Sequence, residues 1–113
     1  MDFSQFFPGV VENLPKADIP VEGVDARLLQ SENGQLVFFD LPEGAEVPPH
    51  SHGEQWGAVL EGEVELTIGG ETKTYRKGDT YHIPAGVVHG AKFPTRCKVI
   101  DLFADTDRYS IKA

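Results

Sequence analysis

The stretch WGAVLEGEVELTIGGETKTYRKGD, residues 56–79, decides the fold. Within it Val64, Leu66 and Ile68 alternate with polar residues, so the stretch has a period of two and one apolar face. The Gly-Gly pair that follows supplies two positions that tolerate positive φ, as a tight hairpin turn requires. The stretch therefore predicts two antiparallel strands joined by a short turn, with one face buried.

Short apolar runs on both sides of this hairpin repeat the same pattern. The 113 residues include 12 Gly and 8 Pro, which separate these runs as turns do. No helical periodicity persists long enough to build a helical layer. About eight to ten short strands at this spacing indicate one antiparallel sandwich or barrel. We expect an N-terminal extension over residues 1–20 and the barrel domain over residues 21–113.

Charge and composition exclude several classes of function. The chain has 18 acidic and 10 basic residues, a net charge of −8, and no basic cluster of the kind that binds nucleic acid. No apolar run approaches the ~20 residues that span a bilayer, and the first residues lack the pattern of a signal peptide. The single cysteine, Cys97, suits a reducing compartment, and a place in a strand is favoured over a reactive thiol. We expect a cytoplasmic protein without nucleic-acid or membrane partners.

Two histidines in the segment PPHSHGEQW, residues 48–56, form the first candidate for a binding site. Side chains two apart on a strand project from the same face, so His50 and His52 can present two nitrogens to one ion. Imidazole binds Zn, Fe, Ni, Cu and Mn. An isolated pair of this kind is weak evidence, so its surroundings decide the interpretation.

These surroundings resemble the first of two sequence motifs of the cupin superfamily. That motif is Gly, five residues, His, one residue, His, three or four residues, Glu, six residues and Gly. The chain has Gly44, His50, His52 and Gly62 at matching places, with a shortened gap before the fourth position.

The segment GDTYHIPAGVVHGAKF resembles the second cupin motif, which is Gly, five residues, Pro, one residue, Gly, two residues, His, three residues and Asn. The matching residues are Gly78, Pro84, Gly86 and His89, and Phe93 stands in place of the Asn. The resemblance implies an all-β fold, a single antiparallel double-stranded β-helix, or jelly-roll barrel.

The resemblance further implies that His89 joins His50 and His52 at one divalent transition metal. Nickel, manganese, iron, zinc and copper all remain open as its identity. Three imidazoles that converge from strands of a small barrel leave coordination positions free for a ligand.

The fourth metal ligand is either Gln55 or Glu54, which as neighbours on a strand face opposite ways. Counting back from Gly62 by the spacing of the motif favours Gln55, whereas counting forward from His52 selects neither. A neutral amide in place of a carboxylate leaves the site more positive, which favours an anionic, oxygen-rich ligand.

Tyr81, within the second motif, is the candidate catalytic residue, because the hydroxyl at the end of its apolar ring can donate a proton or contact the substrate. Other residues on flanking strands are candidates for lining the cavity. They are Trp56, Phe38, Phe39, Arg27 and Asp101.

A cupin fold is compatible with many functions. We favour a small metalloenzyme that isomerises or tautomerises a compact anionic or sugar-derived substrate, because some single-domain cupins with Gln as the fourth ligand are similar and ketonise unsaturated uronates. A metal-dependent dioxygenase and a non-catalytic small-molecule or sugar-binding cupin are the alternatives. We also expect a homodimer, since single-domain cupins usually pair and the Phe-rich extension over residues 1–20 offers apolar area for the contact.

Overall fold

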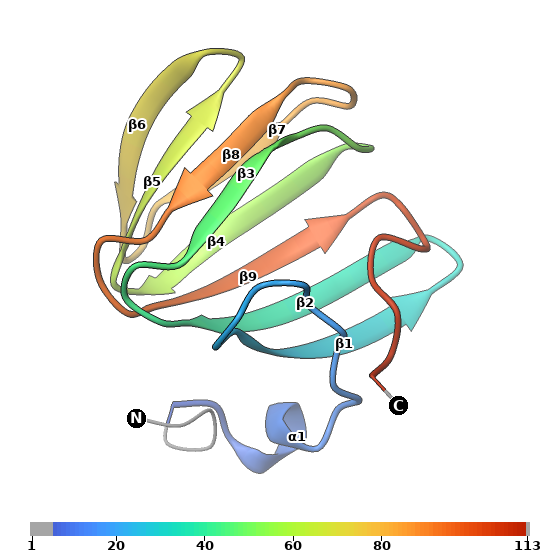
Figure 1. The fold of residues 1–113 in the computed structure, drawn as a ribbon. Coiled ribbons are helices and arrows are strands. Elements are labelled where there is room, and N and C mark those ends of the chain that lie inside the picture. Colours follow the sequence, from blue (N-terminus) through green and yellow to red (C-terminus); the bar gives the residue numbers. More distant parts are fainter. Residues whose placement is uncertain (1–5, 113) are drawn as a thin grey trace.

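The computed structural model describes residues 6–112 of the chain. This part is almost entirely β-structure, arranged as two antiparallel sheets (Figure 1). Its elements are α1 (Gly9–Glu12), β1 (Asp25–Ser31), β2 (Gly34–Leu41), β3 (Glu46–His50), β4 (Gln55–Glu61), β5 (Glu63–Ile68), β6 (Glu71–Arg76), β7 (Thr80–Ile83), β8 (His89–Lys92) and β9 (Cys97–Phe103).

Strands that are distant in the sequence pair with one another in both sheets. The five-stranded sheet has the order β1-β2-β9-β4-β7, and the four-stranded sheet has the order β3-β8-β5-β6. The chain therefore crosses repeatedly from one sheet to the other, as in a jelly roll. The predicted all-β, antiparallel jelly-roll barrel is confirmed.

The hairpin that decides the fold is formed by β5 and β6. Ile68 pairs with Glu71, and Gly69 and Gly70 between them have φ values of 57° and 85°. Both values lie in the left-handed region that glycine adopts without steric cost, so the predicted turn is confirmed. Val64 on β5 is buried, as the alternating pattern predicts.

The core lies between the sheets and is formed by alternate residues of the strands. Val37 and Phe39 on β2 and Val64 and Leu66 on β5, from the two sheets, belong to one buried apolar cluster. Cys97 belongs to the same cluster, and burial raises the pKa of its thiol to about 12. The cysteine is thus a neutral core residue, as the sequence favoured.

The first described residues cover part of the outer face of the five-stranded sheet, where α1 lies beneath β1 and β2 in Figure 1. Phe7 is buried, and its ring packs edge-on against that of Phe38 with 5.8 Å between the centroids. The backbone of this segment also pairs with β1, since Lys16 forms an antiparallel bridge with Arg27. The described part of the Phe-rich extension therefore covers the sheet of its own chain. Phe3 lies outside the described residues, and a dimer contact by the extension stays a prediction.

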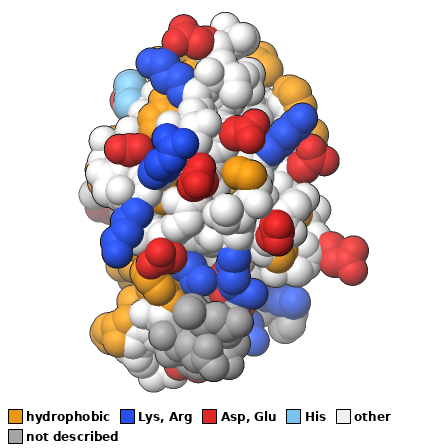
Figure 2. Space-filling model, turned by 90° about the vertical axis from the view of Figure 1, so that its left-hand side faces the viewer, with side chains coloured by type: hydrophobic (Ala, Val, Ile, Leu, Met, Phe, Trp, Pro, Cys, Tyr) orange, Lys and Arg blue, Asp and Glu red, His pale blue; other side chains and the backbone are white. Residues whose placement is uncertain are grey.

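Opposite charges are interspersed on the surface seen from the side of β6. Figure 2 shows acidic and basic side chains alternating over this face, with apolar side chains scattered among them. Three exposed ion pairs connect the charges of the four-stranded sheet: Lys73–Glu71, Arg76–Glu63 and Lys92–Glu46. Over residues 6–112, no helix has the length and apolar character needed to cross a bilayer.

Candidate metal centre

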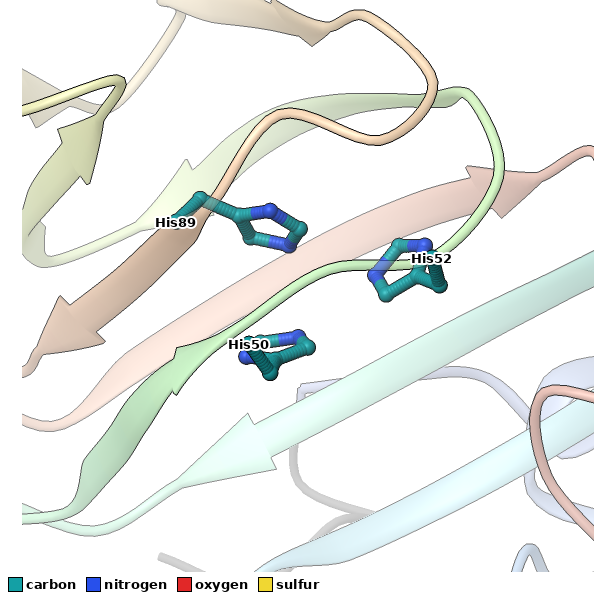
Figure 3. A group of neighbouring side chains, drawn as sticks. All are labelled: His50, His52 and His89. Atoms are coloured by element: carbon teal, nitrogen blue, oxygen red, sulfur yellow. The ribbon is translucent and has the colours of Figure 1, made fainter.

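Three histidines meet in the cavity between the sheets, with their rings turned toward one another (Figure 3). His50 ends β3, His89 begins β8, and the two are paired across these strands. His52 follows β3 in the connection to β4. One candidate ligand atom from each ring lies within 4.8 Å of the other two. The chain thus brings together three imidazoles that are up to 39 positions apart in sequence (89 − 50).

The backbone is irregular where the first two histidines project. The pairing of β3 with β8 shifts register between Val47 and His50, where Pro48 and Pro49 lack the N–H groups that a ladder needs. The strand ends at His50, so His52 lies in the following loop. The sequence expectation that both project from one strand face was wrong in this respect, because the loop rather than strand periodicity directs His52.

Backbone carbonyls determine which ring nitrogen of each histidine can bind a cation. The Nδ1 atoms of His50, His52 and His89 lie 2.8, 2.9 and 3.0 Å from carbonyl oxygens. Because a carbonyl only accepts, each Nδ1 carries the hydrogen and each Nε2 keeps its lone pair. Metal-binding histidines are commonly oriented in this way.

The electrostatic surroundings keep two of the rings neutral. Burial lowers the pKa of His52 and of His89, hydrogen bonds to backbone carbonyls offset part of this effect, and the nearby charge of Arg108 lowers both values further. Only a neutral imidazole binds a metal. Because the pKa values of these two rings are lowered, they stay neutral and able to bind a metal at a lower pH than an ordinary histidine does.

Gln55 faces the cavity and Glu54 does not. Gln55 begins β4, is buried, and lines the cavity with the three histidines. The carboxylate of Glu54 is exposed and lies 2.6 Å from Nε2 of His82, which is also exposed. Gln55 is therefore the member of the adjacent pair that lies beside the imidazoles, and its role as the fourth ligand stays a prediction.

Three buried acceptor atoms in this cavity have no hydrogen-bond partner within residues 6–112: Nε2 of His52, Nε2 of His89 and Oε1 of Gln55. An unsatisfied buried polar atom costs about 1–3 kcal/mol, so three together require an explanation. The three residues that carry these atoms line the same cavity. Their chemistry fits a divalent transition metal, which imidazole nitrogens and an amide oxygen can coordinate.

A buried carboxyl group lies next to Gln55. The hydroxyl of Tyr81 donates to Oδ1 of Asp101 at 2.6 Å, and the Gln55 side chain makes a further hydrogen bond to this carboxyl group. Burial raises the pKa of Asp101 to about 6, and these two hydrogen bonds limit the rise. Burial, followed by the charge of Asp101, raises the pKa of Tyr81 well above its ordinary value, so its hydroxyl stays protonated.

Gly57 makes room for this pair. It lies opposite Tyr81 on β7 and opposite Asp101 on β9, so both side chains meet above it. A Cβ atom at this position would lie 2.1 Å from Oδ1 of Asp101 and 2.4 Å from ring atoms of Tyr81. The close approach of the two side chains therefore depends on a glycine in β4.

A positively charged residue that follows β9 in the sequence, Arg108, also lies at the cavity. Arg108 lines it, with the guanidinium carbon 4.5 Å from the ring centroid of Tyr109. Its Nε atom is buried and has no hydrogen-bond partner in the part of the chain that the structure describes. Sequence reasoning missed Arg108, because the residue lies outside both motifs in a segment without periodicity.

Only some of the residues that the sequence suggested as lining the cavity do so, and the strand face on which each residue lies accounts for the difference. Phe39 and Asp101 line it, whereas Arg27, Phe38 and Trp56 are not among the lining residues. Neighbouring residues on a strand face opposite ways, so the sequence could not assign these faces without the register. The cavity has a volume of about 390 Å³, and much of its remaining wall is apolar: Ile19, Val21, Val24, Leu41, Val47 and Phe93.

Known structures share this architecture. An RmlC-like cupin from Shewanella frigidimarina is 30% identical, with a TM-score of 0.77 over 86% of this chain and 88% of that one. KdgF from a Halomonas species is 27% identical, with a TM-score of 0.71 over 78% of this chain and 85% of that one. Salicylate 1,2-dioxygenase from Pseudoaminobacter salicylatoxidans, solved with gentisate, is 20% identical, with a TM-score of 0.69 over 76% of this chain and 26% of that one, and supports the fold alone. No curated protein matches the sequence.

The family comparison agrees with the motifs and with the fold. The model of the cupin domain matches residues 37–103, which include both histidine motifs and strands β3 to β9. This match spans more than half of the 113 residues. The chain belongs to the cupin domain family.

Proposed function

We propose that the protein is a metal-dependent enzyme that isomerises or tautomerises a compact anionic substrate, such as an unsaturated uronate or a keto acid. One observation carries the proposal: buried lone pairs and a buried guanidinium nitrogen, none with a hydrogen-bond partner among residues 6–112, line the same cavity. The lone pairs suit a metal ion, and the guanidinium suits a carboxylate.

The metal would be held by His50, His52, His89 and Gln55. All four ligands are neutral, so a divalent ion would keep its full charge in the cavity. Nickel, manganese, iron, zinc or copper would suit this set of donors. When bound, such an ion supplies a Lewis acid that polarises a carbonyl or enolate oxygen.

Arg108 binds the carboxylate of the substrate. A guanidinium presents two parallel N–H groups to a carboxylate, which orients the substrate as well as attracting it. The influence of Arg108 on the pKa values of His52 and His89 is consistent with a place close to the imidazoles. The substrate is therefore an anion despite the net charge of −8 on the chain, because the attraction acts locally within the cavity.

Asp101 carries the proton. Tautomerisation of an enol to a ketone removes a proton from oxygen and adds one to carbon, so it needs a group that can accept and donate. Among the described residues that line the cavity, Asp101 has the only carboxyl group. Tyr81 holds this carboxyl group in place through its hydrogen bond, so in this proposal Tyr81 acts through Asp101.

The size of the cavity supports a compact substrate. Its volume of about 390 Å³ lies near the lower end of the usual range for ligand pockets. The similarity to single-domain cupins that ketonise unsaturated uronates and use Gln as the fourth ligand supports the same substrate class.

The test combines metal analysis with an assay. Protein purified without an affinity tag is analysed for bound metals, then incubated with an unsaturated uronate while the absorbance of its double bond is followed. His50→Ala and His89→Ala should abolish turnover, whereas His82→Ala should retain it, because His82 is exposed and outside the cavity. Saturable binding without product would instead indicate a binding protein, and product formation coupled to oxygen uptake would indicate a dioxygenase.

A further inference from the structure

One carboxylate connects the segment that carries Arg108 to the loop that carries His52. Oδ2 of Asp105 accepts a hydrogen bond from the backbone N–H of Gly53 at 2.9 Å. The same oxygen lies 3.6 Å from Nδ1 of His52. Asp105 thus binds the backbone of Gly53, the residue that follows His52. Asp105 itself lies three residues before Arg108 in the sequence.

The contact between the two segments is tight. A Cβ atom on Gly53 would lie 2.2 Å from Oδ1 of Asp105, so a larger residue would displace the carboxylate. Beside this contact, the backbone N–H of Ala104 donates to the carbonyl of Glu54 at 2.8 Å. The loop and the C-terminal segment are therefore joined by a side chain and by the main chain.

A second anchor lies on the other side of Arg108. The side-chain amide of Gln35 donates to the carbonyl of Tyr109 at 2.8 Å, and the N–H of Tyr109 donates to Oε1 of Gln35 at 3.0 Å. Gln35 is almost completely buried in β2, so this anchor is part of the sheet. Arg108 stacks on Tyr109 and lies between the two anchors, which fix its place in the cavity.

We propose that Asp105 is a positioning residue for both halves of the site: it orients His52 toward the metal and holds Arg108 in place for the anion. The inference rests on the proposed function, in which these residues bind a metal and a carboxylate. The carbonyl of Gly53 accepts the Nδ1 hydrogen of His52, and the N–H of Gly53 donates to Asp105, so Asp105 supports the ring through the Gly53 backbone. A residue that supports a metal-binding imidazole in this way orients the ring as a ligand. Asp105 differs from such a residue in that it also determines where the guanidinium lies.

The experiment compares Asp105→Asn with Asp107→Asn. Asp107 is an exposed acid of the same segment, so the control removes the same charge two residues away. Calorimetry gives the affinity of metal-stripped protein for Ni²⁺ and, at saturating Ni²⁺, the affinity for pyruvate as a probe carboxylate. Asp105→Asn should weaken Ni²⁺ binding by about 10- to 100-fold and pyruvate binding by about 5-fold or more, and Asp107→Asn should change neither.

Two further variants keep the inference testable. In an Arg108→Met background, Asp105→Asn should cause no further loss of pyruvate affinity, because the effect passes through Arg108. Gly53→Ala should displace the Asp105 carboxylate by an independent route and weaken Ni²⁺ binding in the same way. A thermal melt of each metal-free variant shows whether it is folded.

The outcomes separate this inference from the proposed function. A wild-type protein that binds neither Ni²⁺ nor pyruvate refutes the proposed function and with it the role of Asp105. A wild-type protein that binds both, together with equal affinities in Asp105→Asn and Asp107→Asn, refutes the role of Asp105 alone. Additive losses in the Arg108→Met background would refute the part that concerns the anion.

Discussion

The hydroxyl of Tyr81 donates a hydrogen bond to the buried carboxyl group of Asp101 at 2.6 Å. The two residues come from β7 and β9, and they meet above Gly57 on the strand between them. The same carboxyl group is hydrogen-bonded to Gln55, so a polar chain runs from Tyr81 through Asp101 to Gln55, which lines the cavity with the three histidines. In a buried site such a chain fixes the positions of its members, because any broken link leaves an unsatisfied group.

Tyr81→Phe should lower turnover while leaving the affinity for metal unchanged. The substitution removes the donor to Asp101 and keeps the ring that packs in the cavity wall. We expect kcat to fall by about 10-fold to 100-fold with a much smaller change in KM, because the group that carries the proton loses its orientation. Tyr75→Phe is the matched control: the ring of Tyr75 packs against Tyr81 at 5.6 Å, and the substitution removes a hydroxyl that does not contact Asp101. Equal kcat values for the two variants would contradict the prediction.

Asp101 should make the metal-free protein less stable as the pH rises through about 6. Burial raises the pKa of this carboxyl group from 3.8 to about 6, so the folded state holds the proton more tightly than the unfolded state. The stabilisation is complete below about pH 4 and is lost as the pH passes 6, which corresponds to up to ~3 kcal/mol in the free energy of unfolding.

Comparison with Asp101→Asn isolates this effect. His52 and His89 have lowered pKa values and therefore oppose it, because their contribution to stability is lost as the pH falls. Both proteins share these histidines, so the difference in unfolding free energy between wild type and Asp101→Asn should change between pH 4 and 7. Urea denaturation in the presence of a chelator measures it, and a difference independent of pH would contradict the assignment.

Local patterns predicted the parts of the fold and site that depend on neighbouring residues. The β5–β6 hairpin follows from alternation and from Gly69 and Gly70, whose conformations are local properties. The partnership of Tyr81 with Asp101 could not be predicted in the same way, because it requires β4 to lie between β7 and β9. Arg108 was missed for a related reason: its place depends on the long-range contact between Gln35 and Tyr109.

Cys97 should be unreactive in the folded protein. The side chain is fully buried, and burial raises the pKa of the thiol to about 12, so almost no thiolate forms near pH 8. We expect a disulfide reagent added to native protein at pH 8 to give no colour over minutes, and one equivalent of thiol to react at once in guanidinium chloride. Rapid reaction of the native protein would show that the strand bearing Cys97 opens readily.

The outer face of the five-stranded sheet should form the contact of a homodimer. Leu29, Leu36, Leu102 and Trp56 are successive pairing partners across β1, β2, β9 and β4. Leu29, Leu102 and Trp56 are 52%, 47% and 43% exposed. Strands lie about 4.8 Å apart, so these residues form an apolar row roughly 15 Å long. In a dimer with two-fold symmetry, which is the symmetry of most dimers, this row on one subunit can pack against the same row on the other subunit.

Trp56→Glu tests this contact, because a charge within an apolar interface is costly to bury. Light scattering should give twice the mass of the chain for the wild type and the mass of a single chain for Trp56→Glu. Val88→Glu is the control: Val88 is 56% exposed and precedes β8 in the four-stranded sheet, away from the row, so this variant should remain dimeric. Trp56 is the only tryptophan, so its emission should shift to the blue as the wild-type concentration rises through the dissociation constant. A monomeric wild type, or a dimer that persists in Trp56→Glu, would show that a second copy does not cover the row.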